Sequence, residues 1–200
     1  MSAGKQVFVV GGSGMTGKKI VELLCENPAF SRIVLFGRRT INLPSAPPHL
    51  EQKIVDFDKL SDNQGLFSGF DVGVCALGST LKGSTREIYK KVDYDYVVAT
   101  AKMAKNCDVK TFCLLSASSA DEKSHFYYIK IKARDREKPS LGYTLLTNLL
   151  KPTMYFTARL QIQDTDIAKA LITTSLNNSK KGTIPLDATQ MKKIADGYNN

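Results

Sequence analysis

The stretch KQVFVVGGSGMTGKKIVELLC, residues 5–25, decides the fold of this chain. Residues 6–10 form a short apolar run that ends in glycines, which is typical of a buried β-strand. From residue 16 to residue 25, apolar side chains recur at the spacing of one helix face. The chain therefore begins with a strand, a glycine-rich turn and a helix.

Outward from this stretch, short apolar runs continue to alternate with helical patterns. We expect strands at 32–36, 52–57, 71–77, 111–116 and 143–150, and helices at 85–104, 167–176 and 187–195. Apolar strands separated by helices predict a parallel sheet covered on both faces, and right-handed crossovers make this a doubly wound α/β fold. With 200 residues and 42% hydrophobic content, we expect a single domain over residues 1–200.

Composition narrows the class of protein. The longest apolar runs are far shorter than the ~20 residues of a transmembrane helix, and we expect no signal peptide and no transmembrane segment. Four cysteines without CxxC spacing and two distant histidines, His49 and His125, favour a reducing compartment and no metal site. The net charge of +9 comes from scattered lysines, which favours solvated surfaces over direct nucleic-acid binding. We expect a soluble intracellular protein.

Glycine recurs at every third position of the turn, since Gly11, Gly14 and Gly17 form GxxGxxG between the strand and the helix. Glycines permit a tight turn and a close approach of backbone N–H groups to a pyrophosphate at the helix N-terminus. Residues 12–18 also match GxxxxGK, the start of a nucleoside triphosphate-binding loop. That loop needs Ser or Thr at the next position to hold Mg²⁺, and this chain has Lys19. Dinucleotide binding is therefore the favoured interpretation.

The second expected strand runs into Arg38 and Arg39, about twenty residues past the glycines. At this position a carboxylate would hold the ribose 2′-OH of NAD, whereas a guanidinium pairs with the 2′-phosphate of NADP. Two arginines without a carboxylate favour NADP(H) as the cofactor, and the alternative is a solvated arginine pair.

Tyr128 and Lys132 are four residues apart, the spacing of neighbours on one helix face. A lysine beside a phenol favours the phenolate and lowers the pKa of the tyrosine, so that the phenol can pass a proton to a carbonyl as NADPH gives hydride. One such pair is expected by chance in a lysine-rich chain, but this pair follows the fifth expected strand. Ser116 at the end of that strand, favoured over Ser118, could hydrogen-bond a substrate carbonyl.

Between residues 7 and 132 the chain resembles the Tat-interacting protein 2 family, an atypical branch of the short-chain dehydrogenases. The resemblance rests on six segments in family order: GGSGMTG, FSRIVLFGRR, VDFDKL, FDVGVCALGST, VDYDYV and LLSASSADEKSHFYYIKIK. It implies an NADP(H)-binding Rossmann domain with Ser116, Tyr128 and Lys132 as catalytic residues. The implied cofactor-binding residues are Gly11, Ser13, Gly14, Met15, Thr16, Gly17, Arg38, Arg39, Asp56, Leu77, Gly78, Tyr128 and Lys132.

The chain departs from the family pattern at Ala117, where the family has a second serine, and at Lys151-Pro152-Thr153, where the family has Arg-Pro-Gly. Residues 152–167 also form a shorter segment than in the family, which predicts a reduced C-terminal substrate region.

We therefore expect an NADPH-dependent reductase of a small carbonyl compound, and the alternative is an NADPH-sensing adaptor without turnover. For either, the resemblance implies nuclear import receptors as protein partners, regulatory roles in apoptosis and trafficking, and a location in the cytoplasm and also the nucleus.

Overall fold

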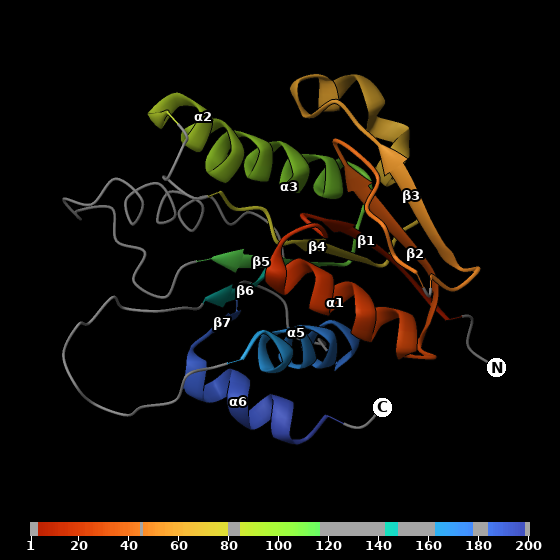
Figure 1. Ribbon diagram of the computed structural model, residues 1–200, viewed down its shortest axis with the longest axis vertical. Helices are drawn as coiled ribbons and strands as arrows, with labels where there is room; N and C mark the ends of the chain where they lie inside the picture. Colours follow the sequence, from red (N-terminus) through yellow and green to blue (C-terminus); the bar gives the residue numbers. More distant parts are fainter. Residues whose placement is uncertain are drawn as a thin grey trace.

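The computed structural model describes residues 4–44, 46–79, 85–116, 143–147, 163–177 and 184–198. In this part of the chain, seven parallel strands form one sheet in the order β3-β2-β1-β4-β5-β6-β7 (Figure 1). The strands are β1 (Lys5–Val10), β2 (Phe30–Gly37), β3 (Leu50–Ile54), β4 (Val72–Cys75), β5 (Thr111–Ser116), β6 (Tyr143–Thr147) and β7 (Ile184–Leu186). The strand order reverses between β1 and β4, which confirms the expected doubly wound fold.

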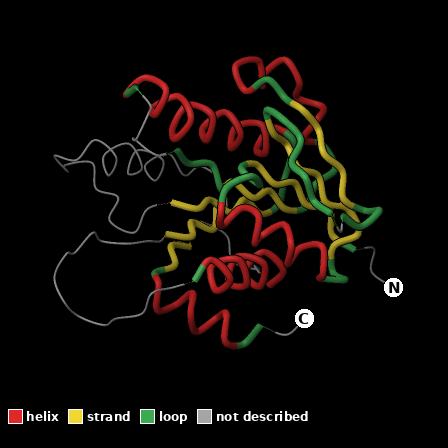
Figure 2. The backbone as a smooth tube through the Cα atoms, in the orientation of Figure 1, coloured by secondary structure: helices red, strands yellow, loops and turns green. Residues whose placement is uncertain are grey.

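Helices cover both faces of the sheet (Figure 2). One face carries α1 (Met15–Glu26), α5 (Asp164–Asn177) and α6 (Ala188–Asp196). The other face carries α3 (Tyr96–Asn106) and the 3₁₀ segment η1 (Phe57–Phe67). A short helix, α2 (Arg86–Lys90), leads into α3 through a π-helical turn, Lys91–Asp95.

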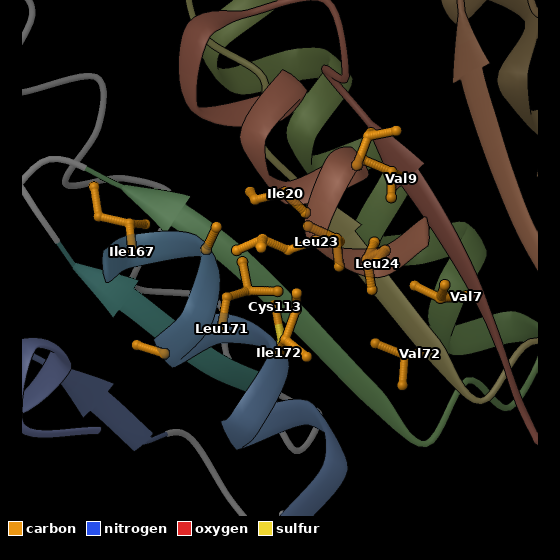
Figure 3. Packing of buried hydrophobic residues seen from close by; sticks show 14 of the residues in the cluster. Val7, Val9, Ile20, Leu23, Leu24, Val72, Cys113, Ile167, Leu171 and Ile172 are labelled. Carbon is orange, nitrogen blue, oxygen red and sulfur yellow. The ribbon is translucent and has the colours of Figure 1, made fainter. Parts of the chain in front are cut away.

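Side chains of β1 point alternately into two separate cores, because successive residues of a strand face opposite sides of a sheet. Val7 and Val9 pack with α1 and α5 on one face, where Leu23, Leu171 and Cys113 also lie (Figure 3). Phe8 faces the other side and meets Phe67 edge-on, with ring centroids 5.0 Å apart. Each fully buried Leu, Val or Phe contributes about 1.5–3 kcal/mol, so these layers hold the ends of the strands in fixed positions.

Four elements differ from the sequence-based expectations. The third strand occupies Leu50–Ile54 instead of 52–57, and η1 follows it unpredicted. The helix expected at 85–104 contains the π-helical turn. β7 lies between the helices expected at 167–176 and 187–195, where no strand was expected. None of the helices in the described ranges has the length and apolarity needed to cross a membrane.

Candidate cofactor-binding site

The glycine loop between β1 and α1 is built by close backbone contacts. Gly11 has a φ of +88°, and a Cβ there would lie 2.5 Å from the carbonyl carbon of Ala76. A Cβ on Gly17 would collide with the carbonyl oxygen of Gly11, so the first turn of α1 can lie against the loop only without a side chain. The first and third glycines therefore shape the turn.

Gly14 precedes α1 and faces more open space. Its backbone N–H donates to the carbonyl oxygen of Gly11 at 3.2 Å, and a Cβ on it would meet that oxygen at an ordinary 3.6 Å. Gly14 has no side chain to cap the helix, and the first turn contains no acidic residue. The N–H groups and the positive end of the helix dipole thus remain suited to an anionic group, which is how a pyrophosphate binds in such loops.

A pocket of about 440 Å³ opens at this loop, at the carboxyl ends of the central strands. This is the point in an open α/β sheet where ligands bind. Its walls are residues 11–14, 35–41, 52–53 and 76–78, together with Phe57, Val92 and Tyr96. Among the described residues that line it, none is Asp or Glu. The pocket therefore joins a loop shaped for a pyrophosphate to the arginine pair after β2.

The segment that carries Arg38 and Arg39 is tied to the adjacent strand at two places. The N–H of Val55 donates to the carbonyl oxygen of Gly37 at 2.9 Å. The amide of Gln52 accepts from the N–H of Ile41 at 2.8 Å and donates to its carbonyl oxygen at 2.9 Å. Both arginines are exposed and line the pocket. The neighbouring strand thus fixes the backbone that presents the two guanidinium groups.

Phe57 and Tyr96 form an aromatic wall of the pocket, with ring centroids 5.2 Å apart. The hydroxyl of Tyr96 donates to Asp58 at 3.1 Å, and the ammonium of Lys91 lies 2.8 Å from the same carboxylate. The hydrogen bond from Lys91 holds the pKa of Asp58 below its usual value. Burial of the ring and the bond to Asp58 both raise the pKa of Tyr96, which stays a neutral phenol at physiological pH.

The structure brings together most of the cofactor-binding residues expected from the sequence. Those that line the pocket are Gly11, Ser13, Gly14, Arg38, Arg39, Leu77 and Gly78. Ser116 is buried at the end of β5. Tyr128 and Lys132 lie outside the described residues.

Four expected contact residues do not line the pocket, and each has a different place. Met15 is 83% exposed at the start of α1, and Gly17 is buried against the loop. The hydroxyl of Thr16 donates to Asp164 in the first turn of α5 at 2.5 Å. The carboxylate of Asp56 accepts from the N–H of Asp58 at 2.9 Å and caps η1.

Sequence reasoning missed Gln52, Lys53, Phe57 and Tyr96, which all line the pocket. They come from β3, η1 and α3, and none belongs to a short motif. The alternation of side chains along β3 predicts only that Gln52 and Lys53 face opposite sides of the sheet. It does not predict that both residues line this pocket.

Residues 6–102 match a family described as the NAD binding domain of semialdehyde dehydrogenase. The matched region runs from β1 into α3 and includes both the glycine loop and the arginine pair. Solved structures of low sequence identity share the fold. The UDP-glucose 4-epimerase of Bifidobacterium longum, in complex with NAD⁺ and UDP, is 14% identical with a TM-score of 0.67, over 90% of this chain and 70% of that one. The fold and the pocket define a Rossmann protein that binds a nicotinamide dinucleotide.

Relatives of higher identity identify the family. Protein HTATIP2 of Rattus norvegicus is 38% identical over 135 residues, which are 67% of this chain and 56% of the rat protein. Protein fmp52, mitochondrial, of Emericella nidulans is 34% identical over 153 residues, or 73% of this chain and 65% of that protein. This chain belongs to the Tat-interacting protein 2 family. Its matches span between about half and two thirds of the length of these two relatives.

The expected location in the cytoplasm and nucleus is wrong. Several fungal relatives are mitochondrial by name, including the proteins of Emericella nidulans, Scheffersomyces stipitis and Candida albicans. Cysteine usage indicates a reducing compartment, and it does not separate the reducing compartments of a cell from one another.

Proposed function

We propose that this protein binds NADP(H) and reduces a small carbonyl compound. The observation that carries the proposal is the arrangement of one pocket, with a glycine loop shaped for a pyrophosphate at one end and Arg38 and Arg39 at the other. In the described part of the chain neither arginine has an ion-pair partner. Both guanidinium groups can therefore bind a ribose 2′-phosphate, to which planar guanidinium groups pair well.

Three residues of the chain have separate roles in such a reaction. Bound NADPH supplies a hydride to the carbonyl carbon. Tyr128 gives its phenolic proton to the carbonyl oxygen, and Lys132 favours the phenolate that results. The hydroxyl of Ser116 orients the carbonyl at the end of β5. The roles of Tyr128 and Lys132 rest on their four-residue spacing and on the family resemblance.

Titration of the purified protein with NADPH and with NADH, at fixed salt, tests the cofactor. We expect the wild-type protein to bind NADPH more tightly than NADH. Replacing Arg38 or Arg39 with Ala should weaken NADPH binding about ten-fold or more, since a hydrogen bond to a charged group is worth ~1.5–3 kcal/mol. NADH binding should change little. Equal affinities of the wild-type protein for the two nucleotides would rule out the proposed preference.

Tyr128→Phe separates the reductase from the NADPH-sensing adaptor. In a reductase this substitution abolishes carbonyl reduction while NADPH binding remains. In an adaptor, the cofactor acts by stabilising one conformation, so partner binding would respond to NADPH with or without the phenol. The resemblance supplies nuclear import receptors and apoptosis regulation as the partners and role to test in that case.

A further inference from the structure

Lys53 lies at the arginine end of the pocket, although it belongs to a different strand. The register of β2 and β3 places it opposite Phe36, two residues before Arg38. Lys53 lines the same pocket as Arg38 and Arg39. Three cationic residues thus line a cavity that has no acidic residue among its described lining.

The ammonium of Lys53 is only loosely paired. Its nearest carboxylate oxygen is Oε2 of Glu51 at 3.9 Å, beyond hydrogen-bond distance. Glu51 is instead held by Arg32, whose Nε and Nη2 atoms donate to the two carboxylate oxygens at 2.7 and 3.1 Å. Because this bidentate pair occupies Glu51, the ammonium of Lys53 retains donors for a ligand, and its side chain is 39% exposed.

The charge of a phosphate monoester, such as a ribose 2′-phosphate, matches the three cationic residues better than the charge of a phosphate diester does. A monoester carries about −1.5 to −2 charges at neutral pH and three acceptor oxygens. A ribose hydroxyl in the same place carries no charge and would give these cationic residues no counter-charge from the ligand. Resting on the NADP(H) binding proposed above, we propose that Lys53 completes a three-cation site for the 2′-phosphate and sets the preference for NADP(H) over NAD(H).

Calorimetric titration with two small nucleotides tests this role without turnover. Adenosine 2′,5′-bisphosphate and adenosine 5′-monophosphate differ only in the 2′-phosphate. Lys53→Gln should weaken binding of the bisphosphate about ten-fold, through the loss of one charge-assisted hydrogen bond. Binding of the monophosphate should stay within about two-fold, because no 2′-phosphate is present to lose a partner. Lys53→Arg should keep most of the preference.

Lys59→Gln is the matched control, because Lys59 is exposed on η1 and does not line the pocket. It removes the same charge and should leave both titrations unchanged. An equal loss of both nucleotides in Lys53→Gln, or no loss of either, would overturn the role of Lys53. Equal binding of the two nucleotides by the wild-type protein would overturn the NADP(H) preference itself. A preference that depends on Arg38 but not on Lys53 would leave the proposed function standing and refute only this inference.

Discussion

Ser79 donates two hydrogen bonds to one carboxylate oxygen of Asp93, from its backbone N–H at 2.8 Å and from its hydroxyl at 2.5 Å. Asp93 is 0% exposed and lies in the π-helical turn before α3. π-Helical turns occur frequently at functional sites. Leu77 and Gly78, just before Ser79, line the cofactor pocket, as does Val92 beside Asp93. The buried carboxylate therefore ties the loop after β4 to the helix across the pocket.

Replacing Asp93 with Ala should lower the free energy of unfolding by about 1–3 kcal/mol, because it leaves the two half-buried donors of Ser79 without their acceptor. It should also weaken cofactor binding, since residues 77–79 lose their anchor. Ser79→Ala keeps the backbone hydrogen bond and should cost about 1 kcal/mol. Urea denaturation and NADPH titration of both variants measure these effects. Wild-type NADPH affinity in a folded Asp93→Ala variant would show that the anchor does not position the loop.

Gly17→Ala should mainly lower stability, whereas Gly14→Ala should mainly weaken cofactor binding. The methyl group that Gly17→Ala adds would strike the backbone of Gly11, and overpacking of this kind costs about 1–3 kcal/mol. The methyl group that Gly14→Ala adds meets the same backbone at an ordinary distance, so stability should change little, but it would lie where a pyrophosphate approaches. We expect thermal unfolding to report the first substitution and nucleotide titration the second. Matching effects of the two substitutions in both measurements would argue against separate roles.

Thr16→Val tests whether Thr16 is structural. Its hydroxyl joins the first turn of α1 to Asp164 in the first turn of α5. Loss of this hydrogen bond should lower the free energy of unfolding by about 1 kcal/mol and leave the ratio of NADPH to NADH affinity unchanged. Denaturation measures the free energy of unfolding, and paired titrations with NADPH and NADH measure the affinity ratio. A changed ratio with unchanged stability would instead support the cofactor contact that the family resemblance implies.

Cys113 should make the fold sensitive to alkaline pH. Burial raises the pKa of its thiol to about 12, whereas a free cysteine ionises near about 8.5. As the pH rises, the unfolded state releases the thiol proton while the folded state keeps it. The contribution of the neutral thiol to the free energy of unfolding is therefore fully present below about pH 8.5 and is lost as the pH rises toward 12. The maximal slope is about 1.4 kcal/mol per pH unit.

Denaturation of the wild-type protein and of Cys113→Ala between pH 8 and pH 10, in a reducing buffer, measures this contribution. The substitution removes buried atoms and should destabilise the protein at pH 7. We expect its stability to fall less steeply with pH than that of the wild-type protein. Parallel curves for the two proteins would contradict the assignment to Cys113. Cys25, whose pKa burial raises to about 11, remains in both proteins and cancels in the comparison.

The central strands could be predicted because their residues are buried on both faces. β1, β2, β4 and β5 appear in the sequence as apolar runs, and α1 as an apolar stripe of helical period. η1 has no such signal, because Lys59 and Asn63 leave helical geometry and a local cap at Asp56 starts it. β7 is only three residues long and includes Pro185, so its strand conformation depends on pairing with β6.

The sequence by itself determined the opening strand, glycine turn and helix, and it placed Arg38 and Arg39 after the second strand, because these features depend on neighbours along the chain. Only the tertiary structure decided that Lys53 lines the same pocket as the arginines and that Tyr96 packs against Phe57 in the wall of that pocket. Thr16 likewise bonds to a helix 148 residues away. The physical reason is that a parallel sheet brings together the carboxyl ends of strands that are distant in sequence. The register of the strands then selects which side chains meet there.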